Sequence, residues 1–122
     1  MSRIERDEER EERIHNEVIV DAYDSEEQAM GWFYYLAETM PFPFQARCIQ
    51  EVRKSPLKMG ETVTVIDMIA DDDSHEMLVE INLMGRTMGV PLYQLEPIDV
   101  DEDTRQAIED WQYWVARGYQ FG

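Results

Sequence analysis

Residues 77–95, MLVEINLMGRTMGVPLYQL, contain the clearest structural pattern of this chain. Apolar side chains recur at every second residue from Met77 to Leu83, and this period of two is typical of a strand with one buried face. Met84 and Gly85 then predict a tight turn into a second strand over residues 86–90. A β-hairpin is therefore the first element that the sequence predicts.

The hairpin belongs to a longer antiparallel pattern. The same alternation runs through residues 44–48 and 62–66, on the other side of a turn at Gly60. Residues 91–95, PLYQL, resemble the single-turn helical link before the last strand of an SH3-like barrel. Five short strands at these intervals favour a small antiparallel barrel over a parallel sheet.

Two amphipathic helices are predicted on either side of the strands. The first begins at Asp24, an N-cap residue with Glu27 in the reciprocal capping position, and ends before Pro41. The second spans residues 103–117. Apolar residues at helical spacing mark the buried faces of the two helices: Ala29, Trp32, Phe33, Leu36 and Met40 in the first, and Ile108, Trp111 and Val115 in the second. The predicted fold class is α+β: a small SH3-like antiparallel β-barrel flanked by an N-terminal and a C-terminal α-helix.

Residues 1–17 differ in composition from the rest of the chain. Acidic and basic residues alternate there at spacings of three and four, which would support a solvated helix. Ile4 and Ile14 provide too few apolar side chains for a packing face. We therefore expect a charged N-terminal arm over residues 1–17 and a single domain over residues 18–122.

The charge balance excludes several classes of function. With 27 acidic and 11 basic residues the formal net charge is −16. Such a chain repels nucleic acids and anionic lipid, and attracts cations and basic proteins. The sequence shows no apolar membrane span and no signal-peptide core, so we expect a soluble, cytoplasmic protein. We also expect a monomer. Cys48 is the single cysteine, expected to be a buried thiol, and it excludes an intramolecular disulfide and a thiolate metal site.

The sequence carries little that is typical of an enzyme. His15 and His75 are the two histidines, and neither lies in a metalloprotease or catalytic-triad pattern. No glycine-rich phosphate loop occurs, and no carboxylate pair stands in an apolar setting that would raise a pKa for acid catalysis. We therefore expect a non-enzymatic protein.

Acidic residues concentrate after the last predicted strand, where Asp99, Asp101 and Asp103 alternate. In an extended loop their side chains would point to one side, roughly 6–7 Å apart per step. Each pair would repel by about 0.7–3 kcal/mol, depending on the dielectric. Either the loop is solvated, with Asp103 capping the following helix, or it holds a cation such as Ca²⁺, which takes oxygen ligands in flexible geometry. Spacing alone leaves both interpretations open.

The Asp-x-Asp-x-Asp spacing does not make a conventional EF-hand. Thr104 stands where the turning glycine belongs, and Asp110, at the twelfth position from Asp99, falls inside the predicted helix.

Further acids could complete one or two sites. Asp21 and Asp24 precede the first predicted helix, whereas Glu38 lies in its last turn, where exposed carbonyl oxygens could join a cation site. Asp24 and Glu38 are about 21 Å apart along the helix axis and cannot share one ion. A third acidic run, residues 71–76, is expected to be a solvated loop between strands.

Several stretches resemble the small acidic calcium-binding proteins of cyanobacteria, the CcbP-like family. These stretches are VIVDAYDSEEQAMGWFYYLAETMPFPFQARC, SPLKMGETVTVIDM, GRTMGVPLYQLEPIDVDEDTRQAIEDW and YWVARGYQF, which together cover nearly everything after residue 17. The resemblance implies a Ca²⁺-binding protein outside the EF-hand class, with two sites of unequal affinity, that acts in calcium buffering or signalling. The acids carried over as ligands are Glu38, Asp99, Asp101, Asp103, Asp21 and Asp24.

An alternative function comes from a different class of protein. A strongly acidic barrel could be an interaction module for a basic protein partner, or a mimic of nucleic acid. A mimic needs acids spread regularly over one face, whereas seven of the fifteen residues from 96 to 110 are acidic. That concentration favours a cation, and a calcium sensor would still need a target.

Overall fold

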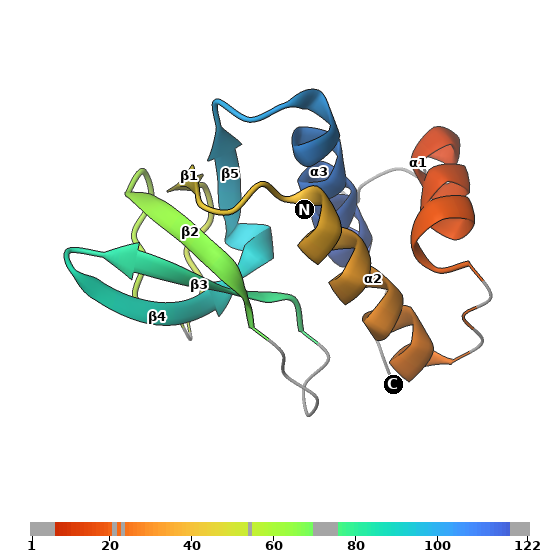
Figure 1. Cartoon of the computed structure of the whole chain (residues 1–122), viewed down its shortest axis with the longest axis horizontal. Coiled ribbons are helices and arrows are strands. Elements are labelled where there is room, and N and C mark those ends of the chain that lie inside the picture. Colours follow the sequence, from red (N-terminus) through yellow and green to blue (C-terminus); the bar gives the residue numbers. More distant parts are fainter. Residues whose placement is uncertain (1–6, 21, 23, 54, 70–75, 118–122) are drawn as a thin grey trace.

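The computed structural model describes residues 7–20, 22, 24–53, 55–69 and 76–117. Along the chain the elements are α1 (Glu8–Arg13), the π-helical turn η1 (Ile14–Val18), α2 (Ser25–Thr39), β1 (Phe44–Cys48), β2 (Thr62–Ile69), β3 (Leu78–Leu83), β4 (Arg86–Pro91), the 3₁₀ turn η2 (Leu92–Gln94), β5 (Leu95–Ile98) and α3 (Glu102–Ala116). The helices α2 and α3 lie side by side next to the sheet, and α1 lies on their far side (Figure 1).

All pairings in the five-stranded sheet are antiparallel, in the order β4-β3-β2-β1-β5. The predicted turn at Met84 and Gly85 is confirmed: both residues have positive φ, 54° and 80°, as a type I′ hairpin turn requires. Residues 71–75 of the third acidic run lie outside the described residues.

The predicted α+β class is confirmed, and so are the helical turn over 92–94 and the five strands. Among the described strands, however, β4 and β5 each pair with a single neighbour and not with one another. The sheet is thus open at these two edges, and the closed barrel expected from the sequence is not found in this part of the chain.

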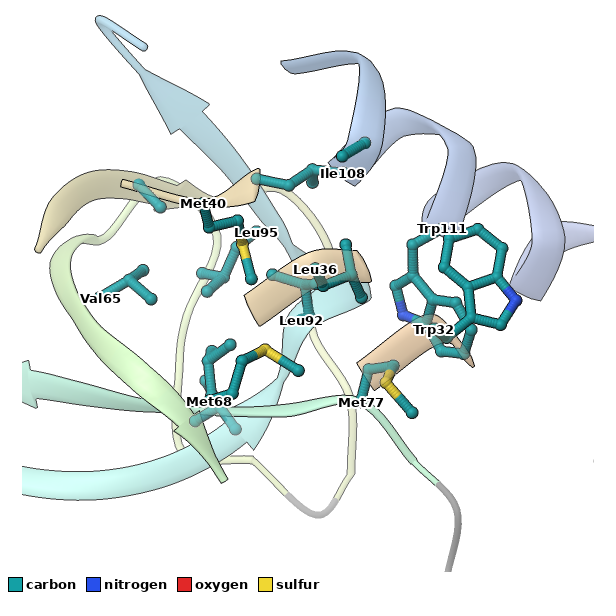
Figure 2. Packing of buried hydrophobic residues seen from close by; sticks show 14 of the residues in the cluster. Trp32, Leu36, Met40, Val65, Met68, Met77, Leu92, Leu95, Ile108 and Trp111 are labelled. Atoms are coloured by element: carbon teal, nitrogen blue, oxygen red, sulfur yellow. The ribbon is translucent and has the colours of Figure 1, made fainter. Parts of the chain in front are cut away.

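The core fills the space between the sheet and the two longer helices (Figure 2). Leu36 of α2, Ile108 of α3 and Val65 of β2 are all fully or almost fully buried. Trp32 and Trp111 meet edge to face with ring centroids 4.9 Å apart. The apolar stripes predicted for both helices therefore form the core, and Cys48 is buried as expected.

The N-terminal segment differs from the expected arm without a packing face. Ile14 is fully buried, and Val18 and the carboxyl-bearing Glu11 are also buried. The expectation that this segment lacks a packing face is wrong, because Ile14 and Val18 belong to the core. In addition, Arg10, Arg13 and Glu11 bond to residues of α3, about 100 positions away in the chain.

Candidate metal centre

An open hollow of about 380 Å³ lies where the end of α2 meets the start of α3 and the end of η1. It is lined by Glu17, Tyr35, Glu38, Thr39, Asp101, Asp103 and Gln106. Four of these residues are carboxylates and all four are exposed. Three of the six predicted ligands, Glu38, Asp101 and Asp103, are therefore brought to one place.

Glu38 comes to the hollow because α2 ends just after it. Met40 has extended backbone angles, φ −77° and ψ 130°, as expected for a residue that precedes a proline. The last carbonyl groups of a helix have no partner within the helix and carry partial negative charge. This end of α2 is thus electrostatically suited to a cation.

Asp101 begins α3 as its N-cap. Its Oδ1 accepts a hydrogen bond from the Thr104 backbone N–H at 3.2 Å and another from the Thr104 hydroxyl. The same hydroxyl lies 3.3 Å from the Thr39 carbonyl oxygen, which ties the start of α3 to the end of α2. The cap is therefore Asp101, whereas the solvated-loop interpretation of the sequence assigned it to Asp103. Asp103 instead lies in the first turn of the helix.

Asp99 and Asp24 lie elsewhere, and Asp21 is outside the described residues. Asp99 is exposed with φ 53°, in the left-handed region, and does not line the hollow. The extended geometry behind the alternation argument therefore does not hold at this residue. Asp24 is the N-cap of α2, with its Oδ1 2.8 Å from the Glu27 backbone N, as predicted. It stands at the opposite end of that helix from Glu38.

Sequence reasoning missed Glu17. It is the fourth residue of η1, and its carboxylate joins the hollow because the whole N-terminal segment packs on α2 and α3. The available signal was the pair Ile14 and Val18, four residues apart and hence on one side of a helix. Taken together with Ile19, this pair would have marked a short buried stripe.

Tyr35 reports on the electrostatics of the hollow. Burial raises the pKa of its phenol, and the negative charges of Asp110 and Glu17 raise it further. Asp103 acts in the same direction, whereas Arg13 opposes them. The hollow is thus a place where an added negative charge is unfavourable and an added positive charge is favourable.

The donor atoms suit a hard cation. Within the described residues no three acidic, histidine or cysteine side chains already converge on a single point. Exposed carboxylates on three separate segments can, however, turn toward an ion, and they offer oxygen atoms alone. Ca²⁺ accepts about 6–8 oxygen ligands in flexible geometry, whereas Mg²⁺ demands a tight octahedron. The residues therefore fit Ca²⁺ better than Mg²⁺.

A second hollow lies on the sheet and lacks this concentration of acids. Its lining residues come from β1, β2, β3, the turn after β3 and the residue before β2, and the last of these, Glu61, is the one carboxylate among them. The electrostatic preference for a cation therefore belongs to the hollow between the helices.

Oxygen donors gathered around one hollow of an acidic α+β chain are typical of a cation-binding protein. The comparisons with known proteins identify the family. Residues 12–115 match the CcbP family, whose description is "Calcium binding". The chain therefore belongs to this family of calcium-binding proteins.

Two solved structures are similar over the whole chain. The crystal structure of Anabaena CcbP is 48% identical, with a TM-score of 0.84, and the match covers 99% of this chain and 100% of that one. A calcium binding protein in the calcium-binding form is 47% identical, with a TM-score of 0.82 and the same coverage. The comparison with curated proteins finds no match.

Membership of the family confirms the prediction of a calcium-binding protein that the resemblance made. The family is described by calcium binding and not by a reaction. In the described part of the chain no helix is long and apolar enough to cross a membrane.

Proposed function

We propose that this chain binds Ca²⁺ in the hollow between α2 and α3, with Glu38, Asp101 and Asp103 as ligands and Glu17 as a fourth acid. The single observation that carries the assignment is the gathering of four carboxylates from three segments around one hollow. Because these acids repel each other without a cation, an ion that neutralises them is favoured. The chain is proposed to act through binding rather than catalysis.

A second, weaker Ca²⁺ site is proposed near the start of α2. Asp24 is exposed there, and Asp21 belongs to the same stretch of sequence. Glu38 is the last residue but one of the 15 residues of α2, about 21 Å along the helix axis from Asp24, so one ion cannot serve both places. Asp99, also exposed, stays a proposed ligand that would have to reach the hollow by a change in its loop.

The proposed role is calcium buffering or signalling in the cytoplasm by a monomer. The net charge of −16 supports a basic protein as a target in the signalling case. We also propose that the open sheet is related to an SH3-like barrel, because a helical turn precedes β5 and β5 pairs with β1.

Calorimetric titration of metal-stripped protein with Ca²⁺, with Mg²⁺ as competitor, tests the proposal. Replacing Glu38 by Gln and Asp101 and Asp103 by Asn should abolish the tighter binding event, since affinity follows the number of charged ligands. Asn caps a helix about as well as Asp, so α3 should keep its start.

The matched control replaces Asp71, Asp72 and Asp73 by Asn and removes the same number of charges. It should leave the tighter event nearly unchanged. Equal losses in both variants would show that the ion responds to overall charge, and the assignment of the hollow would be wrong.

A further inference from the structure

Two arginines of the N-terminal segment form ion pairs with one buried carboxylate on α3. Asp110 is fully buried. Its Oδ1 lies 2.7 Å from Arg10 Nη1 and 2.7 Å from Arg13 Nη2, and its Oδ2 lies 2.8 Å from Arg13 Nε. Hydrogen bonding to Asp110 raises the pKa of Arg13, so this guanidinium stays charged. A buried carboxylate with two cationic partners is a strong attachment, because losing the partners would leave its charge uncompensated.

A second attachment lies one helical turn further along α3. The Tyr113 hydroxyl is 2.7 Å from Glu11 Oε2, and the Asp7 backbone N–H donates to the same hydroxyl oxygen at 2.9 Å. Glu11, like Asp110, is buried. Both ends of α1 are therefore fixed to α3.

A third attachment joins the end of the segment to α2. Gly31 lies in the middle of α2, where glycine is less favourable than alanine. A Cβ placed there would lie 2.5 Å from the Val18 carbonyl oxygen. The backbone of η1 therefore approaches α2 as closely as it does because residue 31 has no side chain.

Glu17 stands between these attachments. It follows the paired Arg13 by four residues and directly precedes Val18, and it is the one acid of the hollow that comes from the N-terminal segment. None of the hydrogen bonds and close approaches described above involves Glu17 or another acid of the hollow, although the charge of Glu17 also acts on Arg13.

We propose that the segment 7–18 completes the cation site, with Arg10 and Arg13 as positioning residues that act through Asp110 to hold Glu17 over the hollow. The inference rests on the proposed function and deepens it. Arg10 and Arg13 thereby support cation binding, although their positive charges alone would weaken it. By linkage, a bound ion that contacts Glu17 must in turn strengthen the docking of the segment.

The decisive variant is the double replacement Arg10→Gln and Arg13→Gln. Removing two positive charges near a cation site strengthens binding if only overall electrostatics matter. The positioning role predicts the opposite sign: Ca²⁺ affinity should fall by about tenfold, within the range of typical coupling between sites. The matched control, Arg47→Gln with Arg86→Gln, removes two charges from exposed positions on the sheet and should leave affinity unchanged or slightly higher.

A double-mutant cycle separates positioning from general damage. Glu17→Gln should weaken Ca²⁺ binding in the natural chain but have little further effect once both arginines are replaced. Gly31→Ala, which leaves every charge in place, should weaken binding in the same way. If the arginine variant fails to fold by circular dichroism, Glu17→Gln and Gly31→Ala decide the matter.

Hydrogen exchange supplies a readout that does not depend on measuring the affinity. Ca²⁺ should slow amide exchange over residues 8–18 in the natural chain, and the effect should be lost in Glu17→Gln.

The outcomes separate the two proposals. If the Glu38, Asp101 and Asp103 variant loses Ca²⁺ while the arginine and Gly31 variants bind as tightly as the natural chain, the hollow is the site and the positioning role is wrong. If the natural chain binds no Ca²⁺, both proposals fail.

Discussion

Tyr35 lines the hollow with a partly buried phenol, and its pKa offers a test at the scale of one residue. Burial raises the pKa of Tyr35 in the folded protein, and the carboxylates of Asp110 and Glu17 add to the shift. Its contribution to stability is therefore fully present below the ordinary tyrosine pKa of about 10 and is lost as the pH rises toward the folded value.

A Ca²⁺ ion in the hollow should lower the pKa of Tyr35, because a nearby positive charge favours the phenolate. Ultraviolet titration of the natural chain against Tyr35→Phe isolates this phenol among the six tyrosines. Its transition should move to lower pH with Ca²⁺, and Tyr34→Phe, which removes an exposed phenol outside the hollow, is the control. An unmoved Tyr35 transition would place the ion elsewhere.

The sequence predicted individual residues best where the signal was local. The cap at Asp24, the turn at Met84 and Gly85, and the burial of Cys48 each depend on a few neighbours in the chain, and the structure has them as predicted. Asp99 shows the limit. A period-two argument assumes extended backbone, and a single residue with positive φ changes the direction of its side chain.

At the scale of elements, Thr104 joins α2 to α3 through one hydroxyl. It is fully buried and bonds both the Asp101 carboxylate and the Thr39 carbonyl oxygen. Thr104→Val keeps the shape and removes these bonds, and we expect it to cost about 0.5–1.5 kcal/mol of stability, the usual net contribution of a hydrogen bond whose acceptors water can still reach. Urea denaturation measures this cost.

The same variant should weaken Ca²⁺ binding, because Asp101 and the end of α2 both border the hollow. Thr87→Val, at an exposed position on β4, is the control and should change neither quantity. A Thr104 variant that loses stability but binds Ca²⁺ unchanged would show that the junction is structural alone.

The helices illustrate what an element's own periodicity can predict. The stripes of α2 and α3 were readable because each helix places apolar side chains at helical spacing, among them Trp32 and Leu36 in α2 and Ile108 and Trp111 in α3, and these side chains lie in the core. The docking of α1 was not readable, since its apolar content is low and its attachment depends on Asp110, Glu11 and Tyr113. Those contacts join positions about 100 residues apart, which no local pattern encodes.

At the scale of the whole molecule, Ca²⁺ should raise the melting temperature. An ion that binds only the folded chain stabilises it by about 2.7 kcal/mol at a hundredfold excess over Kd, and relief of repulsion among the acids acts in the same direction. Differential scanning calorimetry with and without Ca²⁺ measures the shift, with Mg²⁺ at the same concentration as the ionic-strength control. Equal shifts for both ions would reduce the effect to screening of the −16 charge.

The architecture followed from the sequence further than the site did. Alternating strands and two striped helices predicted an α+β chain, but closure of the sheet depends on β4 meeting β5, a contact between edges that strand patterns do not specify. Likewise, the acids after β5 indicated a cation site. That Glu17 lies at the same hollow as Asp101 and Asp103 could not be predicted, because it depends on the packing of the N-terminal segment against α2 and α3.

The tryptophan cluster has an optical consequence. All three tryptophans of the chain belong to it: Trp32 from α2, and Trp111 and Trp114 from α3, with ring centroids 4.9 and 5.8 Å from Trp32. Indoles this close couple their electronic transitions, so their near-ultraviolet circular dichroism depends on their mutual angles rather than on each ring alone. Any movement of α2 against α3 therefore changes the near-ultraviolet spectrum, which reports the relative orientation of the two helices without an added label.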